Sequence, residues 1–76
     1  MNITLKDKTF YFDKCSLAPE DQILFNNIGC VTVTELKRDT NYLIAPQLPG
    51  IGGKYLRAEA FGTTIMSVSG MHALLS

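Results

Sequence analysis

With 76 residues the chain has room for one hydrophobic core, so we expect a single domain over 1–76, with 1–7 as an N-terminal lead-in and no deep catalytic cleft. Its 46% hydrophobic and 18% charged residues exclude the low hydrophobicity and high net charge of disordered chains. Seven basic residues balance seven acidic ones, which excludes a global positive field, so any phosphate contact must be local.

The first predicted element is a strand over residues 9–12, where apolar and aromatic residues follow one another, as in a strand covered on both faces. We expect this strand at the centre of a sheet. A helix is predicted over 19–28, because Pro19 suits a first helical turn and Gly29 can end a helix in the left-handed conformation. The side chains predicted to form its apolar face are Leu24, Phe25 and Ile28.

Residues 31–34 alternate apolar and polar side chains, which predicts an edge strand with one buried face. After a charged stretch, 42–45 is a compact apolar run that ends at Pro46, and we expect a third strand there. Three glycines within 49–53 oppose regular structure and indicate a tight loop.

A second helix is predicted over 54–61 and ends at Gly62; a fourth strand over 63–67 and a short closing helix over 70–75 follow. The residues predicted to face inward from the second helix are Leu56, Ala58, Ala60 and Phe61. The order β-α-β-β-α-β-α predicts an α/β fold, in which a four-stranded parallel sheet is flanked by three helices through right-handed crossovers.

In a parallel sheet the strand ends and the starts of the following helices gather at one end, where ligands are expected. The residues predicted there are Asp13, Lys14, Cys15, Ser16, Gly52, Gly53 and Lys54. The candidate anion pocket consists of Lys14, Ser16, the N–H groups of Gly52 and Gly53 and the Lys54 ammonium, and Arg57 is a further candidate. The alternative is that the lysines are solvated, that Ser16 caps the first helix and that the glycines only close a loop.

Lys37 and Arg38 are secondary candidates for a phosphate contact, although paired basic residues in loops are usually solvated.

Six stretches occur in the order and spacing of one known family. They are 10–12 as a first strand, 28–31 at a Gly-Gly-Val turn, 39–44 at a Thr-His/Asp-Tyr-Leu-Ile strand, 49–50 with Lys54, Arg57 and Ala58 at a Gly-x-Lys-x-x-Lys-Ala helix start, 62–67, and 74–75. On these residues 8–76 resembles the BRCT domain, especially the compact one at the C-terminus of bacterial NAD-dependent DNA ligases. The resemblance implies a BRCT-like fold and a recognition module whose chemistry lies elsewhere.

Three residues depart from the pattern of this family. Asp13 and Lys14 stand where ligase and replication-factor types have Thr-Gly, which resembles half of a phosphate cup. A carboxylate there would repel a phosphate by about 1 to 4 kcal/mol at contact distance unless a cation such as Lys14 neutralises it. Cys30 replaces a turn glycine and should be tolerated, whereas Met71 replaces a large aromatic, so we expect the last helix to be less firmly seated.

The glycine-rich segment has features of two other phosphate-binding motifs. Residues 48–52 resemble the hairpin of a helix-hairpin-helix motif, which is a minor alternative because that motif needs a preceding helix and Pro46 and Pro49 oppose one. A nucleotide-binding P-loop is rejected, since Leu48 stands where it requires glycine and Tyr55 where it requires Ser or Thr.

No catalytic group, cofactor or metal site is predicted. Cys15 and Cys30 are expected to be reduced thiols, and His72, the one histidine, is expected on the exposed side of the last helix. Structural zinc needs four ligands, and His72 is the only histidine. A nucleophile with a base and an orienting acid is not expected either, because His72 lies in the terminal helix, far from either cysteine in any plausible layout. The phenylalanines are expected in the core: Phe10, Phe12, Phe25 and Phe61.

Our first hypothesis is a non-catalytic module of DNA replication or repair that binds a DNA end through its 5′-phosphate, nicked DNA, or a protein of that machinery. The second is a structural adaptor without an anion site, which dimerises or docks through its first or last helix; Asp13 favours this one. Because no apolar run reaches signal-peptide or membrane-span length, we expect no membrane partner and a place in the cytoplasm, nucleoid or nucleus rather than secretion.

Overall fold

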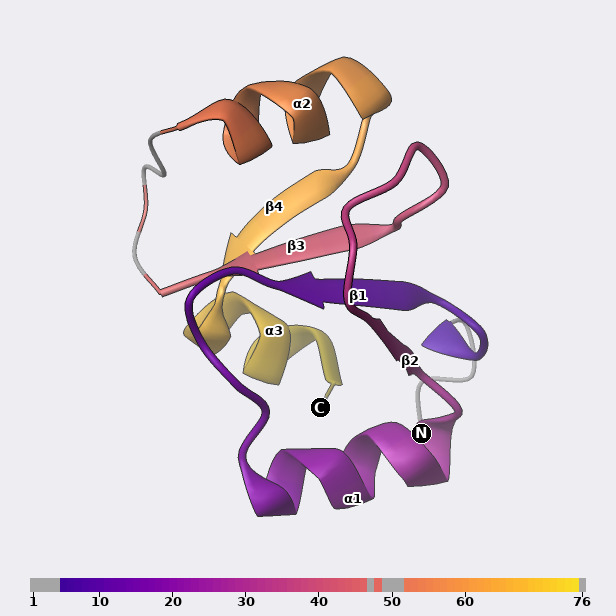
Figure 1. Ribbon diagram of the computed structural model, residues 1–76. Coiled ribbons are helices and arrows are strands. Elements are labelled where there is room, and N and C mark those ends of the chain that lie inside the picture. Colours follow the sequence, from indigo (N-terminus) through magenta and orange to yellow (C-terminus); the bar gives the residue numbers. More distant parts are fainter. Residues whose placement is uncertain (1–4, 47, 49–51, 76) are drawn as a thin grey trace.

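The computed structural model describes residues 5–46, 48 and 52–75. Its elements are, in chain order, β1 (Thr9–Phe12), α1 (Pro19–Ile28), β2 (Val31–Val33), β3 (Tyr42–Ala45), α2 (Gly53–Phe61), β4 (Thr64–Ser67) and α3 (Val68–Leu75). The strands form one parallel sheet in the order β2-β1-β3-β4, so β1 is central and β2 lies at an edge, as predicted. In Figure 1, α2 covers one face of this sheet and α1 and α3 cover the other. The predicted α/β architecture is therefore confirmed.

Local chemistry explains both ends of α1 and the start of α3. Pro19 is the first residue of α1, and Gly29 ends it at a φ of 94°, with its N–H donating to Phe25 O at 2.8 Å. The start of α3 was predicted at residue 70 but lies at Val68. There the Ser67 hydroxyl accepts a hydrogen bond from the Gly70 N–H at 3.1 Å, which satisfies a donor in the first turn of the helix.

The core is divided between the two faces of the sheet, as the alternation of side chains along β1 requires. Phe10 lies among α1 and α3, where its ring centroid is 4.8 Å from that of Phe25. Met71 is fully buried in the same cluster, where its flexible side chain packs against the core, and a less firmly seated last helix stays a prediction. Tyr11 points to the other face, against Ala58 of α2.

The predicted inward faces of α1 and α2 are confirmed in part, since Phe25 and Ala58 are buried and Ile28 packs against the core. Leu24 is 42% exposed, because the buried positions of α1 are Asp21 and Phe25, four residues apart. Leu56 is 70% exposed and Ala60 is also exposed, because α2 packs through Ala58. Among the described residues, no helix is both long enough and apolar enough to cross a membrane.

Candidate functional site

Asp13 is the centre of the candidate site, at the carboxyl end of the sheet, where β1 and β3 finish. Its backbone N–H donates to Ile44 O at 2.9 Å, which continues the pairing of β1 with β3 by one residue. The side chain is buried, with the residue only 3% exposed, and its Oδ2 accepts a hydrogen bond from the Tyr55 hydroxyl at 2.6 Å. Its Oδ1 lies 3.6 Å from the Lys54 Nζ. One carboxylate therefore holds the start of α2 against the end of β1.

Lys54 has a second partner in the sheet. Its Nζ donates to the Tyr11 hydroxyl at 2.6 Å and lies 5.2 Å from the centroid of the Tyr11 ring. This hydrogen bond, with a smaller contribution from the Asp13 charge, raises the pKa of Lys54. The hydrogen bond to Asp13 is likewise the main cause that raises the pKa of Tyr55 to about 12. The four residues Tyr11, Asp13, Lys54 and Tyr55 are here called the Asp13 cluster.

Beside the Asp13 cluster lies a hollow of about 290 Å³, here called the carboxyl-end hollow. Its lining residues are Tyr11, Thr34, Glu35, Leu36, Lys54 and Arg57. Lys54 and Arg57 stand three residues apart on α2, so their side chains share one side of the helix. Within the described part of the chain Arg57 forms no ion pair, whereas Lys54 is paired with Asp13. The hollow therefore offers an anionic group one cation without an ion pair and one that is already partly neutralised, beside the exposed carboxylate of Glu35.

The residues of the predicted anion pocket lie at one end of the sheet, after β1 and at the start of α2, and a common pocket formed by them stays a prediction. Lys14 follows Asp13 with an exposed side chain and a φ of 56°, in the left-handed region, where the resembled family has glycine. Gly52 precedes α2 at a φ of 131°, and Gly53 is its first residue. Ser16 is exposed, and the alternative that it caps α1 is wrong, because the N-cap residue is Ala18.

Sequence reasoning missed the two tyrosines of the Asp13 cluster. Tyr55 follows Lys54 directly in the chain, but no pattern shows that a helix turns its hydroxyl toward a carboxylate 42 positions earlier. Tyr11 was expected in a buried strand, and its hydroxyl reaches the Lys54 ammonium across 43 positions. Both contacts depend on how α2 is seated on the sheet.

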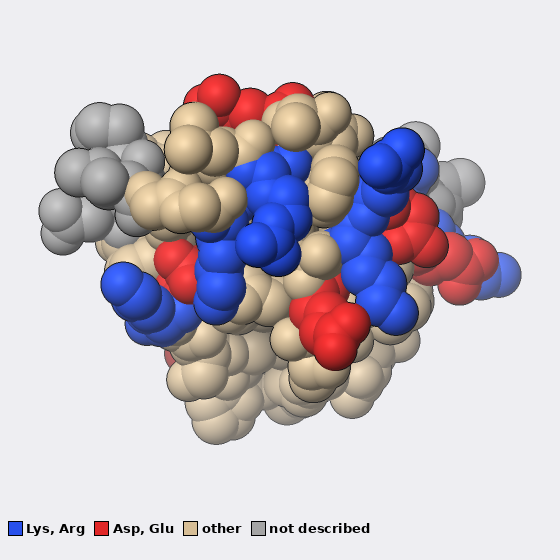
Figure 2. All heavy atoms as spheres, turned by 45° about the horizontal axis from the view of Figure 1, so that its top comes forward, with Lys and Arg blue, Asp and Glu red and all other residues tan. Residues whose placement is uncertain are grey.

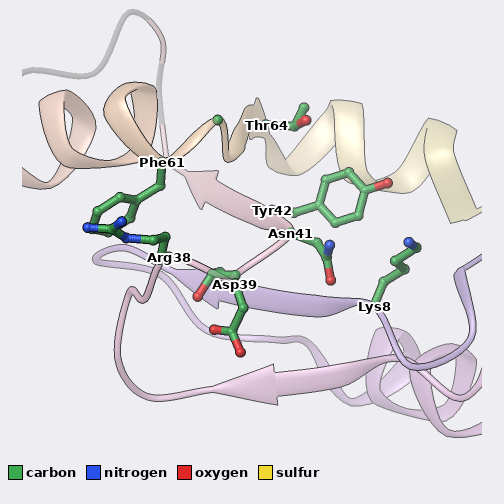
Figure 3. A pocket seen from close by; sticks show the side chains of 9 residues that line it. Lys8, Arg38, Asp39, Asn41, Tyr42, Phe61 and Thr64 are labelled. Atoms are coloured by element: carbon green, nitrogen blue, oxygen red, sulfur yellow. The ribbon is translucent and has the colours of Figure 1, made fainter.

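The secondary candidates Lys37 and Arg38 lie in the β2–β3 connection. The Lys37 side chain is exposed, and its backbone N–H donates to Thr40 Oγ1 at 2.9 Å. The Arg38 guanidinium lies over the ring of Phe61, 5.7 Å from its centroid. It lines a different hollow, of about 300 Å³, at the amino end of the sheet, where β1, β3 and β4 begin (Figure 3).

Figure 2 shows Lys and Arg side chains on the side that α2 covers, with Asp and Glu side chains between them.

The helix-hairpin-helix alternative is wrong, because the element before the predicted hairpin, Tyr42–Ala45, is a strand of the sheet where that motif needs a helix. Within that hairpin, 49–51 lie outside the described residues.

The cysteine thiols are free, and burial raises the pKa of each; at Cys15 the charge of Asp13 adds to the effect. His72 is exposed as predicted, but its Nε2 lies 2.9 Å from Oδ2 of the buried Asp21, a tie between α3 and α1 that sequence reasoning missed. The described residues contain no cluster of three or more His, Cys, Asp or Glu side chains suited to a metal ion.

The chain is similar to known proteins in structure and not in sequence. No family model matches the sequence, and no curated protein matches it. The structure is similar to Rad4 BRCT1,2 in complex with a Crb2 phosphopeptide, at a TM-score of 0.67 and 23% identity over 92% of this chain. It is also similar to Rad4 BRCT1,2 in complex with a Mdb1 phosphopeptide, at a TM-score of 0.70 and 20% identity over 95% of this chain. The chain spans 38% and 40% of the length of these two structures. Its sheet order, its helices and this likeness show that the chain has the fold of a BRCT domain.

Proposed function

We propose that the chain is a non-catalytic recognition module that binds a segment of a protein partner, with an anionic side chain of that segment held by Lys54 and Arg57. The observation that carries this proposal is the carboxyl-end hollow, which both cations line in a fold whose similar structures hold phosphopeptides. Phosphate and carboxylate are the groups that such a cation pair accepts. From the resemblance to ligase and replication-factor domains, we further propose that the partner belongs to DNA replication or repair.

A protein segment suits the carboxyl-end hollow better than a DNA end does. Any phosphate that contacts Lys54, on a peptide or on DNA, comes close to the Asp13 carboxylate, 3.6 Å from the same Nζ, and this repulsion of about 1 to 4 kcal/mol does not distinguish the two ligands. A DNA end brings further phosphates, and a chain with no net charge supplies no field to offset them. A peptide can add uncharged contacts with the Tyr11 ring and Leu36, which line the same hollow.

The test is a binding experiment with three peptide pools that differ only at one fixed central residue, which is phosphoserine, glutamate or serine. We expect the phosphoserine and glutamate pools to bind and the serine pool to bind at least ~5-fold more weakly, since one charge-assisted contact is worth about 1 kcal/mol or more. Lys54→Glu and Arg57→Glu should abolish this preference. Lys37→Glu makes the same charge change at an exposed position outside the hollow and serves as the matched control.

Equal binding of all three pools would overturn the proposal. The same proteins are tested with a DNA duplex with and without its 5′-phosphate. Phosphate-dependent binding of the duplex, lost in Lys54→Glu, would assign the site to DNA ends instead. The peptide and duplex experiments together therefore distinguish a protein partner from a DNA end.

A second candidate function, the structural adaptor, is favoured by the outer side of α1. Ile23 is 61% exposed and stands next to the exposed Leu24, so α1 presents adjacent apolar side chains to solvent. Such a helix suits self-association or docking on another protein. The adaptor hypothesis predicts self-association in sedimentation that Ile23→Glu abolishes and Lys54→Glu leaves intact. A strict monomer that binds the acidic peptide pools would contradict it.

A further inference from the structure

We propose that the amino end of the sheet carries a second binding site, which takes an acidic peptide segment with one carboxylate at Lys8 and another at Arg38. The site is the hollow of about 300 Å³ shown in Figure 3, here called the amino-end hollow, and Lys8, Arg38, Asn41, Tyr42, Phe61 and Thr64 are among its lining residues. It lies at the opposite end of the strands from the Asp13 cluster. This inference goes beyond the proposed function and does not depend on it.

The orientation of the Asn41 side chain is fixed by the chain itself. Its Oδ1 accepts hydrogen bonds from the Thr9 N–H at 2.8 Å and from the Thr9 hydroxyl at 3.1 Å, and the Asn41 N–H donates to Thr9 Oγ1 at 2.9 Å. With the oxygen engaged at β1, the amide nitrogen points to the other side, toward Tyr42 in Figure 3. The two N–H bonds of this nitrogen are therefore held ready for an acceptor on a ligand.

The charged groups of the amino-end hollow are mainly cations. Within the described part of the chain, neither Lys8 nor Arg38 lies within 4.0 Å of a carboxylate. The Arg38 guanidinium lies over the Phe61 ring, a contact that orients it without neutralising it. Asp39 is the one acidic lining residue, and in Figure 3 its carboxylate points away from Asn41 and Tyr42. An anionic ligand thus meets two cations and a neutral donor.

The spacing of these groups indicates an extended ligand. In Figure 3, Lys8 and Arg38 stand on opposite sides of Asn41, so one compact anion does not fill the site, whereas a peptide with two carboxylates places a backbone acceptor between them. A peptide is favoured over nucleic acid because seven acidic residues balance the basic ones and a long polyanion would approach several of them. A short acidic segment needs only the two local cations.

The test is an NMR titration of the full ¹⁵N-labelled chain with a capped Glu-Ser-Glu tripeptide amide. We expect saturable shifts of the Asn41 side-chain amide and of the backbone amides of Gly62 and Thr64, with affinity that falls as salt is added. Arg38→Glu should weaken binding by about 10-fold, because it replaces one ion pair with a repulsive pair. Lys37→Glu is the matched control, since it carries the same charge change one position earlier and does not line this hollow.

Asn41→Asp keeps an acceptor for Thr9 and so keeps the fold, but removes the donor and adds a negative charge, so it should abolish binding while the spectrum stays that of a folded protein. An unshifted Asn41 side-chain amide, or unchanged affinity in Arg38→Glu, would overturn the inference. Shifts confined to Lys54 and Arg57 would also overturn it while supporting the proposed function. Tighter binding of a single-stranded DNA dodecamer at the same residues would show that the ligand is nucleic acid, not peptide.

Discussion

The cations at the two ends of the sheet differ in how far the chain itself supplies their partners. At the carboxyl end the Lys54 ammonium lies 3.6 Å from a buried carboxylate and donates to a tyrosine, so the chain itself supplies most of its partners. At the amino end Lys8 and Arg38 line a hollow without an ion pair in the described residues. A count of lysines and arginines therefore does not locate an anion site, because the neighbouring carboxylates decide how much positive charge remains for a ligand.

One strand connects both ends. Along β1, Thr9 belongs to the hydrogen bonds of the amino end, Tyr11 belongs to the Asp13 cluster, and Phe10 between them points to the opposite face and fills the core. The two ends therefore depend on a common core, although their polar contacts are separate.

The largest expected effect is a loss of stability when the core that both ends share is disrupted. Phe10 is 0% exposed and contacts both Phe25 and Tyr42, so Phe10→Ala should lower the free energy of unfolding by about 3 to 5 kcal/mol. Urea denaturation measures the loss. Leu56→Ala, at a residue 70% exposed, is the control and should stay within about 0.5 kcal/mol of the parent chain. A loss below about 1 kcal/mol for Phe10→Ala would contradict the placement of β1 at the centre.

The next largest effect is a loss of stability when the hydrogen bonds of Asn41 at the amino end are removed. Asn41→Ala leaves the Thr9 N–H without its acceptor and should cost about 1 to 3 kcal/mol in the same denaturation experiment. Asn41→Asp retains an acceptor at this place and should cost clearly less. If both substitutions cost the same, the hydrogen bond from Thr9 is not what stabilises this end.

A smaller effect isolates the carboxyl end through the titration of Tyr55. Its pKa is raised to about 12, so the stabilisation it contributes is present below its ordinary pKa of 10.0 and is lost as the pH rises from 10 to 12. Asp13→Asn removes the charge but keeps an acceptor, and should lower the pKa of Tyr55 toward 10. Phenolate absorbance follows the titration, with Tyr55→Phe to identify the step. An unchanged titration in Asp13→Asn would show that the carboxylate does not hold the Tyr55 proton.

The smallest effect compares the two thiols. Burial and the Asp13 charge raise the pKa of Cys15, whereas burial alone raises that of Cys30. Because the thiolate is the reactive form, Asp13→Asn should modestly accelerate the reaction of Cys15 with a disulfide reagent and leave Cys30 unchanged. Mass spectrometry of the labelled thiols distinguishes the two. Equal acceleration at both would indicate a general loosening of the fold instead of a local charge effect.

Much of the fold could be predicted because its signals are local. Pro19 and Gly29 mark the two ends of α1, and the compact apolar run at 42–45 marks β3. The direction in which α2 faces could not be predicted, since Leu56 and Ala58 are both apolar and only the packing against Tyr11 selects Ala58.

The candidate site was predicted only in outline. The parallel order of strands placed Asp13 and Lys54 at one end, and their contact confirms that placement. The contacts that define the cluster and the amino-end hollow join residues 32 to 43 positions apart, and no pattern of neighbouring residues shows them. The resemblance to the BRCT domains of NAD-dependent ligases stays a prediction.

Asp13 is the internal partner of Lys54 at the carboxyl end, and one paired titration measures its effect on anion binding directly. Inorganic phosphate is added to the ¹⁵N-labelled parent chain and to Asp13→Asn, and the backbone amides of Lys54 and Arg57 are followed. Removing a repulsion of about 1 kcal/mol or more should make Asp13→Asn bind phosphate at least ~5-fold more tightly at these residues. Equal affinity in the two proteins would contradict the account.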